Sequence, residues 1–283
     1  MRRQIFSFIL SLCVVLLAAC TPAATVLTPT QAPATSAAPT ATSQSATITV
    51  FAAASLTDAF GELGNMFENA HPGVTVAQSF GASNTLAEQI NQGAPADVFA
   101  SASTKTMVAA IDGGRIVSGT QKTFAHNRLV VIYPSDNPGQ VTSLQDLAKP
   151  GLKLVLAAKE VPVGQYALDF LDKAVKNPDF GAAYKDDVLA NVVSYEENVR
   201  AVFTKVSLGE ADAGIVYSSD VSGEGSDKVA SLAIPDELNT IATYPIAAVK
   251  DAAQPELAQA FIDLALSAEG QAVFARYGFI TSP

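Results

Sequence analysis

Cysteine is scarce in this chain, with only Cys13 and Cys20 among 283 residues. Both lie in an N-terminal segment in which Arg2 and Arg3 precede an apolar run. This pattern predicts a secretory signal over residues 1–19, too short to be read as a membrane-spanning helix. Because Cys13 leaves with the signal, the mature protein forms no disulfide and depends on its hydrophobic core for stability.

The residues just before Cys20 resemble a bacterial lipobox, in which cleavage leaves this cysteine as a lipid-bearing N-terminus. A plain signal peptide with an incidental cysteine is the alternative. Residues 20–46 are rich in Pro, Ala, Thr and Ser and carry no charge, which predicts a disordered tether. We therefore expect an exported protein, attached through lipidated Cys20 to the outer face of the cell membrane or held in the periplasm.

Histidine is equally scarce, since the chain has only His71 and His126. His71 precedes Pro72 at an expected helix end, where a capping role is the simplest interpretation. Neither histidine has a triad-like context, and the sequence contains no G-x-S-x-G, H-E-x-x-H or Walker loop. We expect a protein that is not an enzyme and has no cofactor or directly bound metal cation. A periplasmic hydrolase stays as the alternative, and it would need a base near Ser55.

Basic residues are too few for some classes of partner. The formal net charge is −10, and removal of Arg2 and Arg3 leaves 15 basic residues against 27 acidic ones, a charge of −12. This balance argues against binding to nucleic acid, which needs a basic surface. An anionic ligand is compatible with it only if the site is built from backbone N–H groups and hydroxyls.

The stretch FAAASLTDAF, residues 51–60, joins a β-rich run to apolar residues at helical spacing, with Ser55 at the junction. The first N–H groups of a helix are unpaired and carry partial positive charge, so such a junction can bind an anion. Ser55-x-x-Asp58 is also an ordinary capping box, which would only start the helix. Both interpretations stay open on the residues alone.

Three more strand–turn–helix junctions follow. The second carries Ser83, although Thr85-x-x-Glu88 is a capping box that could start the helix two residues later. The third is a Pro-Val-Gly turn at residues 162–164, and the fourth leads into a helix that contains Val199. Two junctions fall in each half of the globular chain, which favours two facing α/β units.

We therefore expect an α/β fold of two doubly wound lobes, each a parallel sheet with helices on both faces. A ligand cleft would lie between them, outside the carboxyl ends of the strands. We place lobe 1 at residues 47–125 plus 218–283 and lobe 2 at residues 126–217. The chain would cross between lobes near His126 and Ser218, which permits hinge closure.

Several segments together resemble one known family. They are FAAASLTDAF, SFGASNTLAEQI, GAPADVFASA, VPVGQYA, ENVRAVFTKVSLGEADAGIVYSSD and the C-terminal RYGF. As an ordered set spanning the globular chain, they resemble the molybdate-binding proteins of ABC transporters, which are extracytoplasmic binders of the type II periplasmic-binding-protein fold. The resemblance implies a monomer that holds a tetrahedral oxyanion without Lys, Arg or a metal cation.

Carried over position by position, the resemblance implies five donor residues. Ser55 and Ser83 would donate hydroxyls from lobe 1. Val163 and Val199 would donate backbone N–H groups from lobe 2, and Tyr217 its phenol hydroxyl. Core packing is the alternative for Tyr217, and burial on a helix face is the alternative for both valines.

The chain departs from the family at Asn198, where an aspartate is common. Asn caps a helix as well as Asp does, so we predict that the helix starts there and leaves the Val199 N–H unbonded. A competing start at Ser194, in Ser194-x-x-Glu197, would tie that N–H to a carbonyl one turn back.

The resemblance implies that the protein captures molybdate, and tungstate as well, and delivers it to an ABC permease in the membrane. Another tetrahedral oxyanion such as sulfate is the alternative ligand, because the sequence does not reveal the size of the cavity.

Overall fold

We analysed a computed structural model of the chain, which describes residues 45–282. The predicted signal, the predicted lipidation site Cys20 and nearly all of the predicted tether lie outside the described residues. Within the described range, no helix combines the length and apolar character that crossing a bilayer requires.

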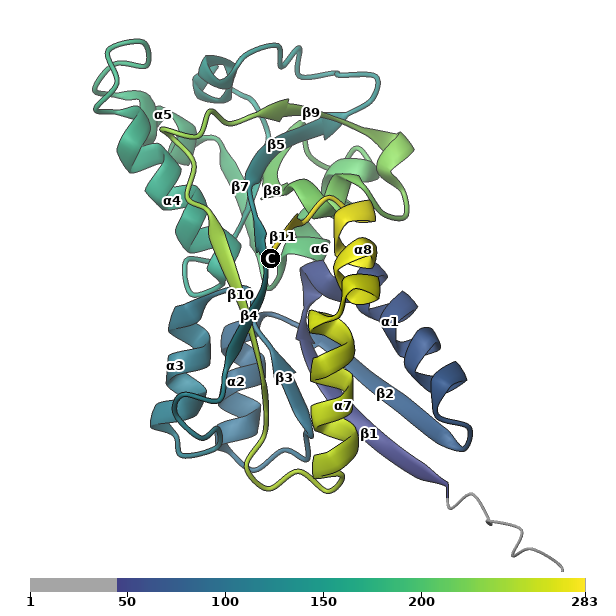
Figure 1. Ribbon diagram of the computed structural model, residues 1–283. Coiled ribbons are helices and arrows are strands. Elements are labelled where there is room, and N and C mark those ends of the chain that lie inside the picture. Colours follow the sequence, from purple (N-terminus) through teal and green to yellow (C-terminus); the bar gives the residue numbers. More distant parts are fainter. Residues whose placement is uncertain (1–44, 283) are drawn as a thin grey trace, which may run out of the picture. The chain divides into compact units, whose positions relative to one another are not determined.

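The chain forms two mixed β-sheets (Figure 1). In spatial order, the first contains β11 (Ile280–Thr281), β4 (Lys122–Asn127), β10 (Ala242–Ala248), β3 (Val98–Ala100), β1 (Ala46–Ala53) and β2 (Val74–Gly81). The second contains β7 (Val192–Glu196), β6 (Leu154–Ala157), β8 (Ala213–Tyr217), β5 (Leu129–Pro134) and β9 (Val229–Ala233).

Eight α-helices accompany these sheets in the described range. They are α1 (Thr57–Ala70), α2 (Ser83–Asn91), α3 (Thr104–Asp112), α4 (Pro162–Ala174), α5 (Tyr184–Ala190), α6 (Val199–Ser207), α7 (Pro255–Leu266) and α8 (Ala268–Arg276). Below, lobe 1 means the first sheet with α1–α3, α7 and α8, and lobe 2 means the second sheet with α4–α6.

Helices cover both faces of the first sheet, as expected. Alternate side chains of β1 point to opposite faces: Val50 belongs to the core beneath α1, α7 and α8, whereas Phe51 belongs to the core beneath α2 and α3. The first core is rich in aromatic residues, with Phe60 of α1 within 6.0 Å, between ring centroids, of Phe124, Phe261 and Phe274.

The expectation of purely parallel sheets was wrong. Each sheet has three parallel strands, β2-β1-β3 and β7-β6-β8, followed by a strand that runs antiparallel to them, β10 and β5 respectively. Parallel neighbours are joined by helical crossovers, whereas β5 and β10 enter their sheets directly from the other lobe without a helix, so nothing imposes a parallel direction on them.

The chain crosses to lobe 2 at Arg128, between β4 and β5, close to the expected position at His126. It does not return at Ser218, because β9 pairs antiparallel with β5 at the edge of the second sheet. The return comes between β9 and β10. The physical reason is that β5 still offers an unpaired edge after β8 has joined it, a fact that no local sequence pattern reveals.

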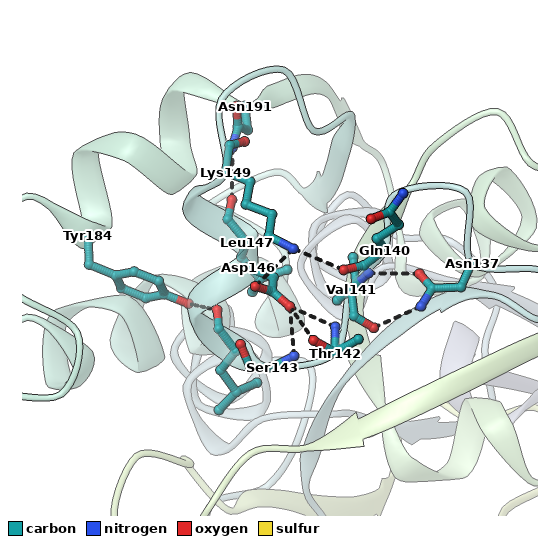
Figure 2. Close-up of polar contacts among 11 residues, drawn as sticks. Asn137, Gln140, Val141, Thr142, Ser143, Asp146, Leu147, Lys149, Tyr184 and Asn191 are labelled. Carbon is teal, nitrogen blue, oxygen red and sulfur yellow. Dashed lines mark hydrogen bonds and ion pairs between the residues drawn. The ribbon is translucent and has the colours of Figure 1, made fainter.

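The long connection from β5 to β6 is held by a polar network in lobe 2 (Figure 2). The Asp146 carboxylate accepts hydrogen bonds from the Thr142 and Ser143 N–H groups at 2.7 and 2.9 Å. Burial alone would raise the pKa of Asp146, but these bonds and Lys149 lower it below its usual range. Tyr184 of α5 donates its hydroxyl to the Leu144 carbonyl at 2.5 Å. This network braces the loop and contributes nothing to the cleft described next.

Candidate functional site

All five residues singled out from the sequence line one small cavity between the lobes. Its walls are Ala53, Ala54, Ser55, Gly81, Ala82, Ser83 and Ala102 from lobe 1, and Val161, Pro162, Val163, Asn198, Val199 and Tyr217 from lobe 2. The lobe 1 residues end or follow β1, β2 and β3, and those of lobe 2 end or follow β6, β7 and β8. The cavity is small, about 10 Å³.

Ser55 does not cap a helix. It lies in a short 3₁₀ turn, Ala54–Leu56, and α1 begins at Thr57 with no side-chain cap. Its hydroxyl instead lies 2.8 Å from the hydroxyl of Tyr244 on β10. The capping-box interpretation of Ser55 is therefore wrong, because its side chain is turned away from the helix N-terminus.

Ser83 is the first residue of α2, so the competing helix start at Thr85 is excluded. The Ser83 side chain is buried, and its Oγ accepts a hydrogen bond from the Ala102 N–H at 2.9 Å. One lone pair of the hydroxyl is thus occupied by lobe 1, and its proton is available to the cavity.

Val163 lies in the first turn of α4, just after Pro162. Among the described residues no acceptor takes its N–H, as expected for the first turn of a helix. The adjacent Gly164 brings this turn against the end of β6: a Cβ there would lie 2.1 Å from the Ala158 carbonyl oxygen. The glycine therefore sets how closely the helix start approaches the strand.

The predicted start of the fourth helix is confirmed. Asn198 is the N-cap of α6, and its Oδ1 accepts from the Ala201 N–H at 3.0 Å. Ser194, the competing cap, lies within β7 and donates to Glu196. Within residues 45–282 the Val199 N–H meets no acceptor, so it is free to bond a guest in the cavity.

Tyr217 ends β8 and is 1% exposed. Its hydroxyl has no hydrogen-bond partner among the described residues. Buried polar groups are normally paired, so an orphaned hydroxyl at the wall of a cavity suggests that a ligand supplies the partner. Burial raises the pKa of Tyr217 well above its ordinary value, which keeps the phenol protonated and able to donate.

None of the lining residues carries a charge. The residues described also include no group of three or more His, Cys, Asp or Glu side chains that could hold a metal ion. An ion pair joins the two lobes, in which Arg200 of α6 contacts Asp58 of α1 at 2.7 Å. An uncharged cavity whose walls present unbonded N–H and O–H groups is suited to a small anion, because each group donates and none needs to accept.

Sequence reasoning missed three residues that support this cavity. Tyr244 and Asn127 lie behind Ser55, and Asp220 accepts the Tyr217 N–H at 3.0 Å. Burial raises the pKa of Asp220 to about 7. No sequence motif marks Tyr244 or Asn127, because their bonding partners lie far away in the chain. The one local signal is Asp220, three residues after Tyr217, where a carboxylate can accept the Tyr217 N–H.

The fold and the cavity define a two-lobed α/β binding protein with its site between the lobes. Residues 48–280 match the family described as bacterial extracellular solute-binding protein. The chain is 36% identical over 230 residues to the molybdate-binding protein ModA of Mycobacterium tuberculosis, covering 81% of this chain and 83% of that protein. The chain therefore belongs to the bacterial extracellular solute-binding proteins.

Two solved structures share the fold. The periplasmic molybdate-binding protein of Azotobacter vinelandii has a TM-score of 0.72 at 21% identity, covering 83% of this chain and all of that one. The sulfate-binding protein SubI of M. tuberculosis has the same TM-score, 0.72, at 19% identity, covering 83% and 86%. Equal structural similarity to binders of two different anions shows the fold and does not distinguish between the anions.

Proposed function

We propose that this protein captures molybdate, and tungstate as well, in the cavity between the lobes and delivers it to an ABC permease. The observation that carries this proposal is the set of hydrogen-bond donors without acceptors around one uncharged cavity, above all the hydroxyl of Tyr217, which has no partner among the described residues. The sequence similarity to ModA adds the identity of the anion. The binding residues in this proposal are Ser55, Ser83, Val163, Val199 and Tyr217.

The energetics agree with an oxyanion. A hydrogen bond to a charged acceptor contributes about 1.5–3 kcal/mol, and five donor residues offset the desolvation of a dianion. Neutral donors also suit an anion that carries no proton at neutral pH. Opening and closing of the lobes about the two crossovers would admit the ligand and then enclose it.

The cellular setting is part of the proposal. Cleavage before Cys20 and acylation of this cysteine would anchor a monomer by residues 20–46 outside the cell membrane, next to the permease. Mass spectrometry of the mature N-terminus tests this step. Cys20→Ala should abolish the lipid mass, whereas a wild-type protein that begins without a lipid would contradict the anchor alone and leave ligand capture intact.

Titration calorimetry with molybdate, tungstate, sulfate and phosphate tests the ligand. We expect heat with the first two and much weaker binding of phosphate. Strong binding of sulfate in preference to molybdate would reassign the anion, and the absence of heat with all four would overturn the proposal.

A pair of variants tests the donor at Val199. Proline is accommodated at the first position of a helix and the extended conformation of Asn198 suits a following proline, so Val199→Pro removes the N–H while α6 still forms. Val199→Ala is the matched control, because it trims the side chain and keeps the N–H. We expect the proline variant to lose about 1.5–3 kcal/mol of binding free energy and the alanine variant much less; equal losses would remove the Val199 N–H from the site.

A further inference from the structure

Behind Ser55, a short chain of buried polar groups leads away from the cavity. The Ser55 hydroxyl lies 2.8 Å from the Tyr244 hydroxyl, and the Tyr244 hydroxyl lies 3.5 Å from Nδ2 of Asn127. Tyr244 and Asn127 are both 0% exposed, and neither lines the cavity. They come from β10 and β4, the neighbouring strands of lobe 1 next to the crossover.

The orientation of the Asn127 amide is determined by its other contacts. Its Oδ1 accepts from the Arg128 N–H at 2.9 Å and from the Ser218 hydroxyl at 2.8 Å. A backbone N–H can only donate, so the oxygen must occupy this position and the NH₂ group must face Ser219 and Tyr244. Asn127 therefore offers Tyr244 a donor and no acceptor.

This arrangement determines the direction of the bond between Tyr244 and Ser55. Within 3.5 Å of the Tyr244 hydroxyl, the described residues offer one acceptor for its proton, the Ser55 oxygen, because the hydroxyl of Tyr217, whose ring packs against Tyr244, makes no hydrogen bond. The opposite direction would leave that proton buried without a partner, which is costly. Tyr244 thus donates to Ser55, and the proton of Ser55 is left to point into the cavity.

The hydroxyl of Ser83 also accepts a hydrogen bond from the protein, but from a backbone amide. Ser83 accepts from the Ala102 N–H at 2.9 Å, so its acceptor position also faces the protein and its proton is available to the cavity. At Ser83 a backbone amide imposes the direction, whereas at Ser55 two side chains impose it. Only the Ser55 arrangement can be altered by a side-chain substitution.

We propose that Tyr244, oriented by Asn127, is a positioning residue that makes Ser55 an obligate hydrogen-bond donor and so selects oxyanions that carry no proton. This inference rests on the proposed function. A protonated oxyanion such as hydrogen phosphate needs an acceptor in the cavity, and a serine whose lone pair already accepts from Tyr244 is a poor one.

The test compares molybdate with hydrogen phosphate by competition calorimetry at about pH 8, where both carry two negative charges and differ in one proton. Tyr244→Phe keeps the ring and frees the Ser55 oxygen to accept. We expect molybdate affinity to fall roughly 2- to 10-fold and the preference for molybdate over phosphate to fall at least about 3-fold. In a Ser55→Ala background, Tyr244→Phe should cause no further change, because Tyr244 acts through Ser55.

Two further variants keep the test decisive. Tyr184→Phe is the matched control, since it removes the hydroxyl of a different buried tyrosine, located in lobe 2 away from the cavity. It should leave the preference for molybdate over phosphate unchanged. Asn127→Asp gives Tyr244 an alternative acceptor and should also lower the preference for molybdate over phosphate. This variant tests the positioning role if the thermal melt of Tyr244→Phe shows an unfolded protein.

The possible failures are distinguishable. A wild-type protein that binds no oxyanion overturns the proposed function. A wild-type protein that binds molybdate, with a Tyr244→Phe variant that keeps the wild-type preference or adds its effect to that of Ser55→Ala, overturns the positioning role alone.

Discussion

Replacing Tyr217 with phenylalanine should separate stability from binding in this protein. The Tyr217 hydroxyl is buried without a partner among the described residues. The ring packs edge-on against Tyr244, with ring centroids 5.9 Å apart, and phenylalanine preserves this contact. The substitution therefore removes one oxygen that bonds no other group of the described residues and that we propose binds the ligand.

The two effects differ. Because the Tyr217 hydroxyl bonds no other group of the described residues, Tyr217→Phe breaks no hydrogen bond within the protein, and the ligand-free variant should be about as stable as the wild type. Loss of a hydrogen bond to a charged acceptor should weaken molybdate binding by about 1.5–3 kcal/mol, roughly a 10- to 150-fold rise in Kd.

Urea denaturation with and without molybdate, together with titration calorimetry, measures both quantities. Saturating molybdate should protect the wild type more than the variant. Tyr184→Phe is the contrasting control: it breaks the bond to the Leu144 carbonyl, so it should lower stability by about 1 kcal/mol and leave affinity unchanged. A Tyr217→Phe protein that binds molybdate as the wild type does, or that is clearly less stable without ligand, would refute the reasoning.

Three other predictions concern groups around the cavity. Burial raises the folded-state pKa of Asp220 to about 7, so between about pH 4 and pH 7 the folded protein keeps a proton that the unfolded chain has lost. The free energy of unfolding should therefore fall by up to about 4 kcal/mol as the pH rises through this range, and urea titrations of Asp220→Asn should lack this fall. The contact of Arg200 with Asp58 joins α6 to α1. A double-mutant cycle with Arg200→Gln and Asp58→Asn should give a coupling of about 1 kcal/mol in the free energy of unfolding, and additive effects would show that the ion pair contributes nothing. Asn198→Asp should keep the helix cap but weaken molybdate binding, measured by calorimetry, because it adds a negative charge at the cavity wall. Asn198→Ala removes the cap and should lower the free energy of unfolding by about 1 kcal/mol.

Much of the local structure was predictable because it depends on neighbouring residues. The strand at Val98–Ala100 follows directly from its apolar run. The start of α6 follows from the capping chemistry of Asn198. The five candidate residues were named from a family resemblance, and their common position around one cavity follows from the strand–helix junctions at the carboxyl ends of parallel strands.

Other features were not predictable from local patterns. Residues 229–233 were expected in lobe 1, yet they form β9 on the edge of the second sheet. Their sequence is compatible with a strand in either sheet, and only the free edge of β5 decides between them. Likewise, Ser55-x-x-Asp58 satisfies the pattern of a capping box, but the side chain of Ser55 bonds Tyr244, 189 residues away.

The sequence by itself therefore determined where helix starts and hydroxyls that can donate hydrogen bonds occur along the chain, since these are local properties. The tertiary structure alone decided which way those donors point. The direction of the Ser55 hydroxyl depends on Tyr244, and that of Tyr244 on Asn127, 117 residues apart in the chain. A hydroxyl can donate or accept with equal ease, and only the fold, by surrounding it with particular partners, removes that freedom.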